Sequence, residues 1–189
     1  MDKTTTDGIR HYAAQVCGVL QNLPAEEIAR AVDVLDRAWA EGRRVFLFGN
    51  GGSAANASHI AVDLVKSAAR PGKPGLRAIS LCDSIPIITA HANDYGYETV
   101  FAGPLEALAE PGDVAFGISG SGNSPNVLRA MEVARDRGLF RIGLTGRDGG
   151  ALRNLVDLCI IVPAESMQQI EDAHLVVLHA IFLALCARG

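Results

Sequence analysis

Ionisable residues near the end of the sequence interrupt a run of apolar residues. They are Glu171, Asp172, His174 and His179, in a segment that predicts a helix from about residue 166 to 187. Burying ionisable groups in an apolar helix costs free energy unless they have partners or a function. Solvent can explain the residues at the start of the helix, whereas His179 lies two turns inside the apolar run. We therefore predict that His179 takes part in chemistry.

A second pair of ionisable residues lies in an earlier helical segment. His59 and Asp63 are four positions apart, so their side chains project from the same face of a helix. This spacing suits the binding of a metal ion or the transfer of a proton. The alternative is that His59 only completes a buried hydrogen-bond network, which is the commoner role of an isolated His/Asp pair. The pair alone leaves both interpretations open.

Two loops rich in glycine and serine could bind an anion. The first is Gly49-Asn50-Gly51-Gly52-Ser53 and the second is Ser119-Gly120-Ser121-Gly122-Asn123-Ser124. Each loop follows a β-rich run and leads into a helical stretch. Glycines let backbone N–H groups turn toward a ligand, and the positive end of a helix favours a phosphate. One such loop could be an ordinary turn, but two at the same edge of a parallel sheet predict a phosphate site.

Neither loop fits a nucleotide-binding pattern. A Walker loop needs Gly-Lys followed by Ser or Thr, and neither loop contains it. Gly49-x-Gly51-x-x-Ala54 matches the dinucleotide pattern in form only, because a basic, Pro/Gly-rich loop at 70–75 takes the place of the expected acidic residue. Serine hydroxyls suit a monophosphate better than a pyrophosphate. We therefore expect a monophosphate ligand.

The elements that position these loops alternate between strands and helices. Two helical patterns come first, at about 5–21 and 24–41, with Pro24 near the start of the second and Gly42 after its end. The β-rich runs that follow are at 45–48, 78–81, 114–118, 141–144 and 158–162. This alternation predicts an α/β fold, with a parallel sheet and helices on both of its faces.

Composition limits the class of protein. The 189 residues are 49% hydrophobic with a formal net charge of −4, which is typical of one soluble domain spanning residues 1–189. Residues 1–6 are polar, so we expect neither a secretory signal nor a membrane anchor, and a cytoplasmic location. The chain lacks a Lys/Arg block with interleaved aromatic residues, so we expect no nucleic-acid partner.

The apolar stretch 175–187 and the cysteines give two further expectations. The stretch is too short to span a bilayer, and a helix that is apolar nearly all round must be buried on every side, which a second copy of the chain would achieve. We therefore expect an oligomer and no membrane partner. Cys17, Cys82, Cys159 and Cys186 are far apart and form no CxxC pair. We expect them to be reduced thiols packed in the core.

Four motifs, in order, resemble the phosphoheptose isomerase family of SIS (sugar isomerase) domains. They are Phe48–Ala55, Ala92–Gly96, Gly117–Leu128 and Gly143–Gly146, and the similarity extends from about residue 10 to the end. The resemblance implies a SIS-type three-layer α-β-α sandwich with a five-stranded parallel sheet, preceded by two N-terminal helices. It also implies a homotetramer whose active sites lie at subunit interfaces.

The resemblance further implies a reaction and a substrate site. Such enzymes interconvert sedoheptulose 7-phosphate and D-glycero-D-manno-heptose 7-phosphate in heptose biosynthesis, by moving a proton between two carbons through an enediol(ate). Ser119, Ser121 and Ser124 would hold the phosphate of this small-molecule sugar phosphate, and Gly120 belongs to the same loop. The residues expected at the rest of the substrate are Asn50, Gly51, Gly52, Ser53, Asn93 and Asp94.

A metal ion is also implied by the resemblance. The family holds one divalent ion per site, usually zinc, with His, Glu, Gln and His as ligands. The corresponding residues in this sequence are His59, Asp63, Glu171 and His179, so the second and third differ from the family pattern. Two histidines and two carboxylates can still bind zinc, manganese or iron. We expect Asp63 or Glu171 to be the base and His179 its acid partner, and the two exchanges leave the preferred phosphosugar open.

The chief alternative is a non-catalytic SIS protein. Such a regulator would bind a phosphosugar or a protein partner, as the relatives that associate with a replication initiator do. Those relatives lack the acidic residue on the first of the two helices and also the final histidine. This sequence keeps ionisable groups at all four positions, which favours the isomerase.

Overall fold

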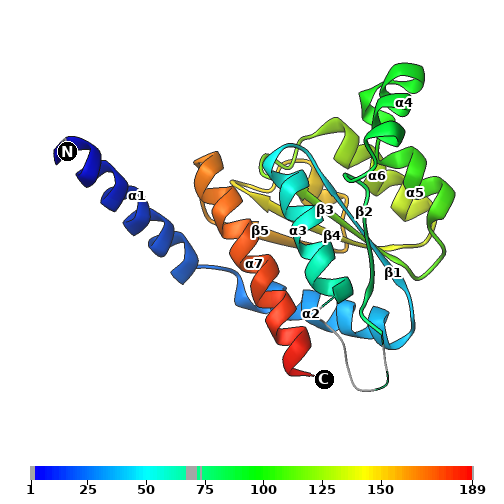
Figure 1. Cartoon of the computed structure of the whole chain (residues 1–189), viewed down its shortest axis with the longest axis horizontal. Helices are drawn as coiled ribbons and strands as arrows, with labels where there is room; N and C mark the ends of the chain where they lie inside the picture. The colour runs from blue at the N-terminus through cyan, green and yellow to red at the C-terminus, as the bar shows by residue number, and fades with distance from the viewer. Residues whose placement is uncertain (1–2, 67–71, 73, 189) are drawn as a thin grey trace.

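A five-stranded parallel sheet forms the centre of the protein (Figure 1). The computed structural model describes residues 3–66, 72 and 74–188, so half of the predicted loop at 70–75 lies outside the described residues. The strand order is β2-β1-β3-β4-β5. The strands are β1 (Arg44–Gly49), β2 (Arg77–Ser80), β3 (Val114–Ser119), β4 (Phe140–Gly146) and β5 (Leu158–Val162). The predicted runs coincide with these strands to within two residues at each end, and the predicted α/β class is confirmed.

Side chains of the central strands are buried on both faces of the sheet. In β1, Val45 and Leu47 join the core on one face, whereas Phe46 and Phe48 join the core on the other. Successive side chains of a strand point to opposite faces, so a strand that is covered on both sides must be apolar throughout. This requirement explains why the strands were recognisable as continuous apolar runs.

Helices cover both faces and complete the three layers (Figure 1). The first face is covered by α2 (Ala25–Ala40), α3 (Gly52–Lys66) and α7 (Met167–Ala187). The second face is covered by α5 (Ala102–Leu108) and α6 (Pro125–Asp136), with α4 (Ile85–Tyr95) at its margin. Two short 3₁₀ helices are η1 (Tyr97–Thr99) and η2 (Leu152–Asn154).

Helix α1 (Lys3–Gln21) projects away from the sheet and is exposed over most of its length (Figure 1). Its side chains reach α7, where the Tyr12 hydroxyl donates to the Asp172 carboxylate at 2.5 Å. Cys17 on α1 and Cys186 near the end of α7 are exposed, so the prediction that they are core residues is wrong for this chain alone. Their positions fall on helix faces that the described residues leave uncovered.

Helix α7 packs along the sheet between α2 and α3 rather than being buried all round (Figure 1). The whole helix of 21 residues is long and apolar enough to cross a membrane by length and composition, so the shortness of the stretch 175–187 does not by itself exclude a span. Ile170, Val177 and Ile181 are buried against the sheet side, whereas Val176 and Leu183 are 40% and 64% exposed. We conclude that α7 is a core helix with one exposed stripe.

Candidate active site

The loop between β1 and α3 lies against a carboxylate that α7 contributes. Gly51 has φ +55°, which residues with a side chain rarely adopt. A Cβ at Gly52 would lie 2.6 Å from the carboxylate of Glu171, so a larger residue there would require that flexible side chain to move. The positive end of the α3 dipole favours an anion at this place. The anion next to this helix end is the Glu171 carboxylate, where the sequence predicted a bound phosphate.

The loop between β3 and α6 gathers three serines. The Ser119 and Ser124 hydroxyl oxygens are 3.1 Å apart, and the Ser121 hydroxyl accepts the Asn123 N–H at 3.2 Å. A Cβ at Gly122, whose φ is +66°, would lie 2.0 Å from the Gly149 carbonyl oxygen. The turn is therefore pressed against the segment after β4, and no other residue fits at Gly122. The hydroxyls are held as a group at the N-terminal end of α6.

A pocket of about 220 Å³ lies between the two loops and α7. Six of the ten residues predicted to bind substrate line it, together with Glu171 from α7. Those six are Asn50, Ser53, Ser119, Gly120, Ser121 and Ser124. Ile118 and Met167 form apolar walls that the sequence did not single out. The arrangement presents hydroxyls, an amide and one carboxylate to a small polar ligand.

Four of the predicted substrate residues lie outside this lining: Gly51 and Gly52 in the first loop, and Asn93 and Asp94. Asn93 and Asp94 are exposed on α4, where the Asn93 side-chain amide donates to the Asp94 carboxylate at 2.7 Å. The following 3₁₀ helix connects this region to the first loop, because the Tyr97 hydroxyl donates to the Asn50 side-chain oxygen at 3.1 Å. Within one chain, α4 therefore lies at the rim of the site.

Three donors from α3 and α7 form a second group. The Nε2 atoms of His59 and His179 are 3.1 Å apart, and the Asp63 carboxylate oxygen lies 3.7 Å from each. Two nitrogens bound to one tetrahedral zinc ion would be about 3.3 Å apart, given Zn–N bonds of about 2.0–2.1 Å. All three donor atoms lie within 4.8 Å of one another. The set fits a divalent cation with an open coordination position, as in catalytic sites.

The fourth predicted ligand occupies a different height on the helices. Glu171 lies beside Gly52, whereas the two histidines of the His/Asp/His group lie seven to eight residues further along α3 and α7, or about 10–12 Å of helical rise. The helices lie side by side and run in the same direction (Figure 1). The structure therefore brings His59, Asp63 and His179 together and places Glu171 in the pocket.

Exposure of the His/Asp/His group differs from the expectation of deep burial. The side chain of His179 is 41% exposed and that of His59 is 49% exposed. The argument that His179 must be buried inside the apolar run is therefore wrong, because the residue lies on the side of α7 that faces α3 and solvent. Its proximity to His59 and Asp63 is the stronger reason to assign it a role.

The buried histidine of α7 is His174. It is fully buried, and neither ring nitrogen has a hydrogen-bond partner among the described residues. Burial lowers the pKa of His174 from 6.5 to about 4, against an opposing effect of the Thr145 backbone. The ring is therefore neutral at pH 7. It lies inside the fold near Thr145 of β4.

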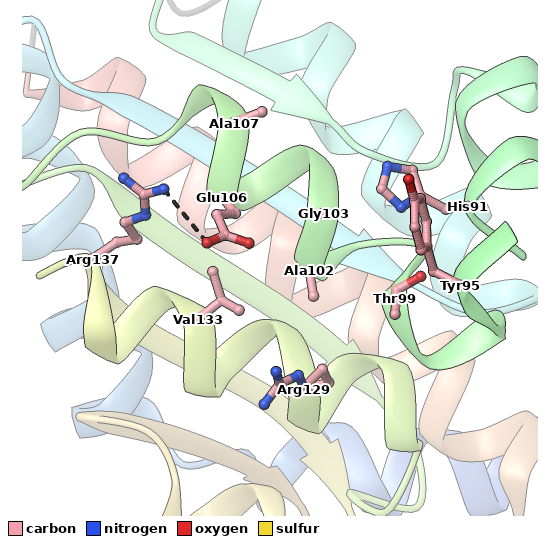
Figure 2. Close-up of a pocket in the computed structure, with 10 residues that line it drawn as sticks. All are labelled: His91, Tyr95, Thr99, Ala102, Gly103, Glu106, Ala107, Arg129, Val133 and Arg137. Atoms are coloured by element: carbon pink, nitrogen blue, oxygen red, sulfur yellow. Dashed lines mark ion pairs between the residues drawn. The ribbon is translucent and has the colours of Figure 1, made fainter.

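A larger pocket lies away from these groups, between α4, α5 and α6. It measures about 550 Å³, and Figure 2 shows His91 and Tyr95 on one side and the ion pair of Arg137 with Glu106, at 3.7 Å, on the other. None of the predicted site residues lines it. Size alone would have directed attention to the wrong part of the molecule.

Comparison with known proteins gives consistent matches along the chain. Residues 10–146 match the SIS domain family. A phosphoheptose isomerase from Trichlorobacter lovleyi is 43% identical over 164 residues, which cover 85% of this chain and 83% of that protein. A phosphoheptose isomerase structure from Francisella tularensis is 31% identical with a TM-score of 0.91, covering 98% and 99% of the two chains. The structure of phosphoheptose isomerase GmhA from Neisseria gonorrhoeae is 30% identical with a TM-score of 0.89, covering 96% of this chain and 98% of that chain.

Proposed function

This chain belongs to the SIS domain family and, within it, to the phosphoheptose isomerases, and we propose that it interconverts sedoheptulose 7-phosphate and D-glycero-D-manno-heptose 7-phosphate. The fold is the SIS-type α-β-α sandwich with a five-stranded parallel sheet. The observation that supports the substrate most directly is the serine-lined pocket beside a separate His/Asp/His group on the same helices. The pocket would hold the phosphate, and the group would lie near the reacting carbons.

The reaction needs one base and one acid and no oxidant or reductant. In the ketose-to-aldose direction, the base removes a proton from C1, and the electron pair forms the C1–C2 double bond of an enediolate. The protonated base, whose proton can exchange with solvent, then delivers a proton to C2, while the hydroxyl proton moves from O1 to O2. Proton transfer by a positioned side chain contributes about 10²–10⁴-fold to such rates.

The position of the phosphate favours one of the two candidate bases. The phosphate is on C7, so C1 and C2 extend away from the serine loop, toward the group about 10–12 Å further along the helices. Asp63 is therefore the first choice for the base, with His179 as its acid partner. Glu171 lines the phosphate pocket and is the alternative base. Loss of C1 proton exchange in Glu171→Gln but not in Asp63→Asn would reverse this assignment.

One divalent metal ion per site, with zinc as the family's usual metal, would be held by His59, Asp63 and His179. When bound, the ion would stabilise negative charge on the substrate oxygens. Glu171 would become a fourth ligand only if its side chain turned away from Gly52. Protein purified without chelator should contain close to one transition-metal ion per chain, as measured by elemental mass spectrometry of the digested protein. Occupancy below about a tenth, with no effect of added zinc on activity, would refute the ligand set.

A homotetramer with interfacial active sites would cover surfaces that one chain leaves open. Helix α4 has no buried residue, α1 is exposed, and the His/Asp/His group is half exposed. Light scattering on the purified protein should give about four times the 19.9 kDa chain mass. We propose a cytoplasmic location for this assembly, as expected for an enzyme of heptose biosynthesis.

The deciding experiment is a panel of phosphosugars incubated with the protein in deuterated water. Sedoheptulose 7-phosphate should yield an aldose phosphate carrying deuterium at C2, detected by NMR, faster than any pentose or hexose phosphate. Sedoheptulose without phosphate should react at least about 100-fold more slowly, because remote binding energy is lost. Tight binding of a phosphosugar with no deuterium incorporation would instead support the alternative of a non-catalytic SIS regulator.

A further inference from the structure

Two asparagine side chains join the two substrate loops by a reciprocal pair of hydrogen bonds. The Asn50 amide nitrogen donates to the Asn126 oxygen at 2.9 Å, and the Asn126 nitrogen donates to the Asn50 oxygen at 2.8 Å. Asn50 lies in the first loop, and Asn126 is the second residue of α6, just after the serine loop. Asn126 is 2% exposed. A change in one amide must therefore be felt by the other.

Backbone and phenol donors fix which way both amides point. The Val127 backbone N–H, which can only donate, points at the Asn126 oxygen at 3.0 Å. A flipped Asn126 would set two donors against each other in a buried site, which costs free energy. With Asn126 fixed, its nitrogen faces the Asn50 oxygen, and the Tyr97 hydroxyl donates to that oxygen as well at 3.1 Å. The oxygen of Asn50 is thus fully used.

The consequence concerns the remaining hydrogen of Asn50. An amide nitrogen carries two hydrogens, and Asn126 accepts only one of them. Asn50 lines the pocket, so the second N–H is available there, while the carbonyl oxygen is turned toward Asn126 and Tyr97. The side chain would present a donor, and not an acceptor, to the ligand.

We propose that Asn126 and Tyr97 are positioning residues that lock the Asn50 amide so that its free N–H donates to an oxygen of the substrate. The inference rests on the proposed function, because it takes Asn50 to contact the sugar phosphate. A donor fixed in advance stabilises the negative charge that develops on the substrate oxygen in the enediolate without reorganising during the reaction. Tyr97 acts from η1 and Asn126 from α6, so two separate elements maintain one orientation.

Tyr97→Phe is the sharpest test, because the side chain is 57% exposed and its removal should leave the fold intact. We expect kcat to fall about 3- to 10-fold, the size of one lost hydrogen bond, and the inhibition constant for inorganic phosphate to stay within about 2-fold of wild type. Tyr95→Phe is the matched control, since Tyr95 is 69% exposed and lines the other pocket. Wild-type kcat in Tyr97→Phe would overturn the proposal.

Two further variants test the orientation itself. Asn126→Leu should lower kcat by more than Tyr97→Phe does, with the phosphate inhibition constant again unchanged. Asn50→Asp replaces the pocket-facing donor by an acceptor and should lower kcat at least about 100-fold, and more than Asn50→Ala does. If Asn50→Asp kept wild-type kcat, Asn50 would be presenting its oxygen, and the proposal would be wrong.

A readout without catalysis separates this inference from the proposed function. The side-chain amide protons of Asn50, assigned in ¹⁵N–¹H spectra by their loss in Asn50→Asp, should shift in Tyr97→Phe and not in Tyr95→Phe. Such shifts in a protein that isomerises no phosphosugar would support the positioning network and refute the isomerase. Unchanged Asn50 signals in both Tyr97→Phe and Asn126→Leu would refute the network, whatever the activity.

Discussion

The serine pocket and the His/Asp/His group are built in opposite ways. The pocket is formed largely by loops at the carboxyl ends of β1 and β3, and Ser119 within it is 3% exposed. The His/Asp/His group consists only of side chains on the outer faces of two helices, with exposed fractions of 26–49%. The residues that line the pocket are brought together within one chain. The three donor atoms of the group are also brought together within one chain, but their side chains remain partly exposed to solvent.

This difference matters for chemistry, because burial controls the strength of electrostatic interactions. Exposed charged pairs contribute about 0–1 kcal/mol, whereas fixed dipoles in a site without water stabilise developing charge far more strongly. Anchoring a phosphate tolerates some solvent, but an enediolate next to open water would be protonated at random. The comparison therefore predicts that the His/Asp/His group becomes effective only when another copy of the chain covers it.

The largest expected effect comes from removing one member of that group. His179→Ala should lower kcat about 10³-fold and change KM little, because the residue is assigned to proton transfer and not to phosphate binding. The side chain is 41% exposed, so the free energy of unfolding should change by less than about 1 kcal/mol. Initial rates with sedoheptulose 7-phosphate and a urea titration measure the two quantities.

His11→Ala is the matched control for this variant. His11 is exposed on α1 and belongs to neither the serine pocket nor the His/Asp/His group. The control should keep wild-type kcat. An active His179→Ala enzyme would remove the proposed acid and would leave the serine pocket as the only supported part of the site.

The next effect sharpens the contrast between the two sides of α7. His174 faces the sheet, with a pKa of about 4 in the folded protein and about 6.5 when unfolded. Below pH 6.5 the unfolded chain binds a proton that the folded chain does not, so the free energy of unfolding falls as the pH falls from about 6.5 to about 4. The full loss is about 3 kcal/mol. Urea titrations at several pH values should show this slope.

His174→Leu should remove that acid-dependent component, while the control His11→Ala, which leaves His174 in place, should keep it. The comparison is between slopes, so a general loss of stability in His174→Leu does not obscure it. Equal slopes in wild type and His174→Leu would mean that His174 accepts a proton inside the fold.

The fold was largely predictable because its strands satisfy a strict physical requirement. Central parallel strands are buried on both faces, and this condition leaves continuous apolar runs such as Leu158–Val162. Helices α4 and α5 gave no comparable signal. Helix α4 buries none of its residues in this chain, so its amphipathic pattern reflects surfaces that one sequence does not reveal.

The loop that forms part of the serine pocket could be predicted from the sequence, whereas contacts that depend on how the helices pack could not. The serine loop was predicted from local rules, since glycines and hydroxyls between a strand and a helix N-terminus favour an anion. The place of Glu171 beside Gly52 depends on how α7 packs on α3, and spacing along the chain does not specify it. The Asn50–Asn126 pair joins residues 76 positions apart, so only coordinates reveal it. Burial of Cys17 and His179 was misjudged because apolar neighbours in sequence do not identify the covered face of a helix.

The smallest effect tests the pocket side of the comparison. Ser124→Ala removes the hydroxyl that lies 3.1 Å from the Ser119 hydroxyl. A hydrogen bond to a charged phosphate is worth about 1.5–3 kcal/mol. KM for sedoheptulose 7-phosphate should rise about 10- to 100-fold, while kcat stays within about 3-fold. The inhibition constant for inorganic phosphate should rise by the same factor as KM, because both ligands would use the same hydroxyl.

Ser84→Ala is the control for Ser124→Ala, since Ser84 precedes α4 and its side chain makes no capping hydrogen bond. It should leave both constants unchanged. Together with His179→Ala, the pair of variants separates the two regions kinetically, one through KM and the other through kcat. If Ser124→Ala lowered kcat and left the phosphate inhibition constant unchanged, the serine loop would face the reacting carbons, and the direction of the substrate along α3 and α7 would have to be reversed.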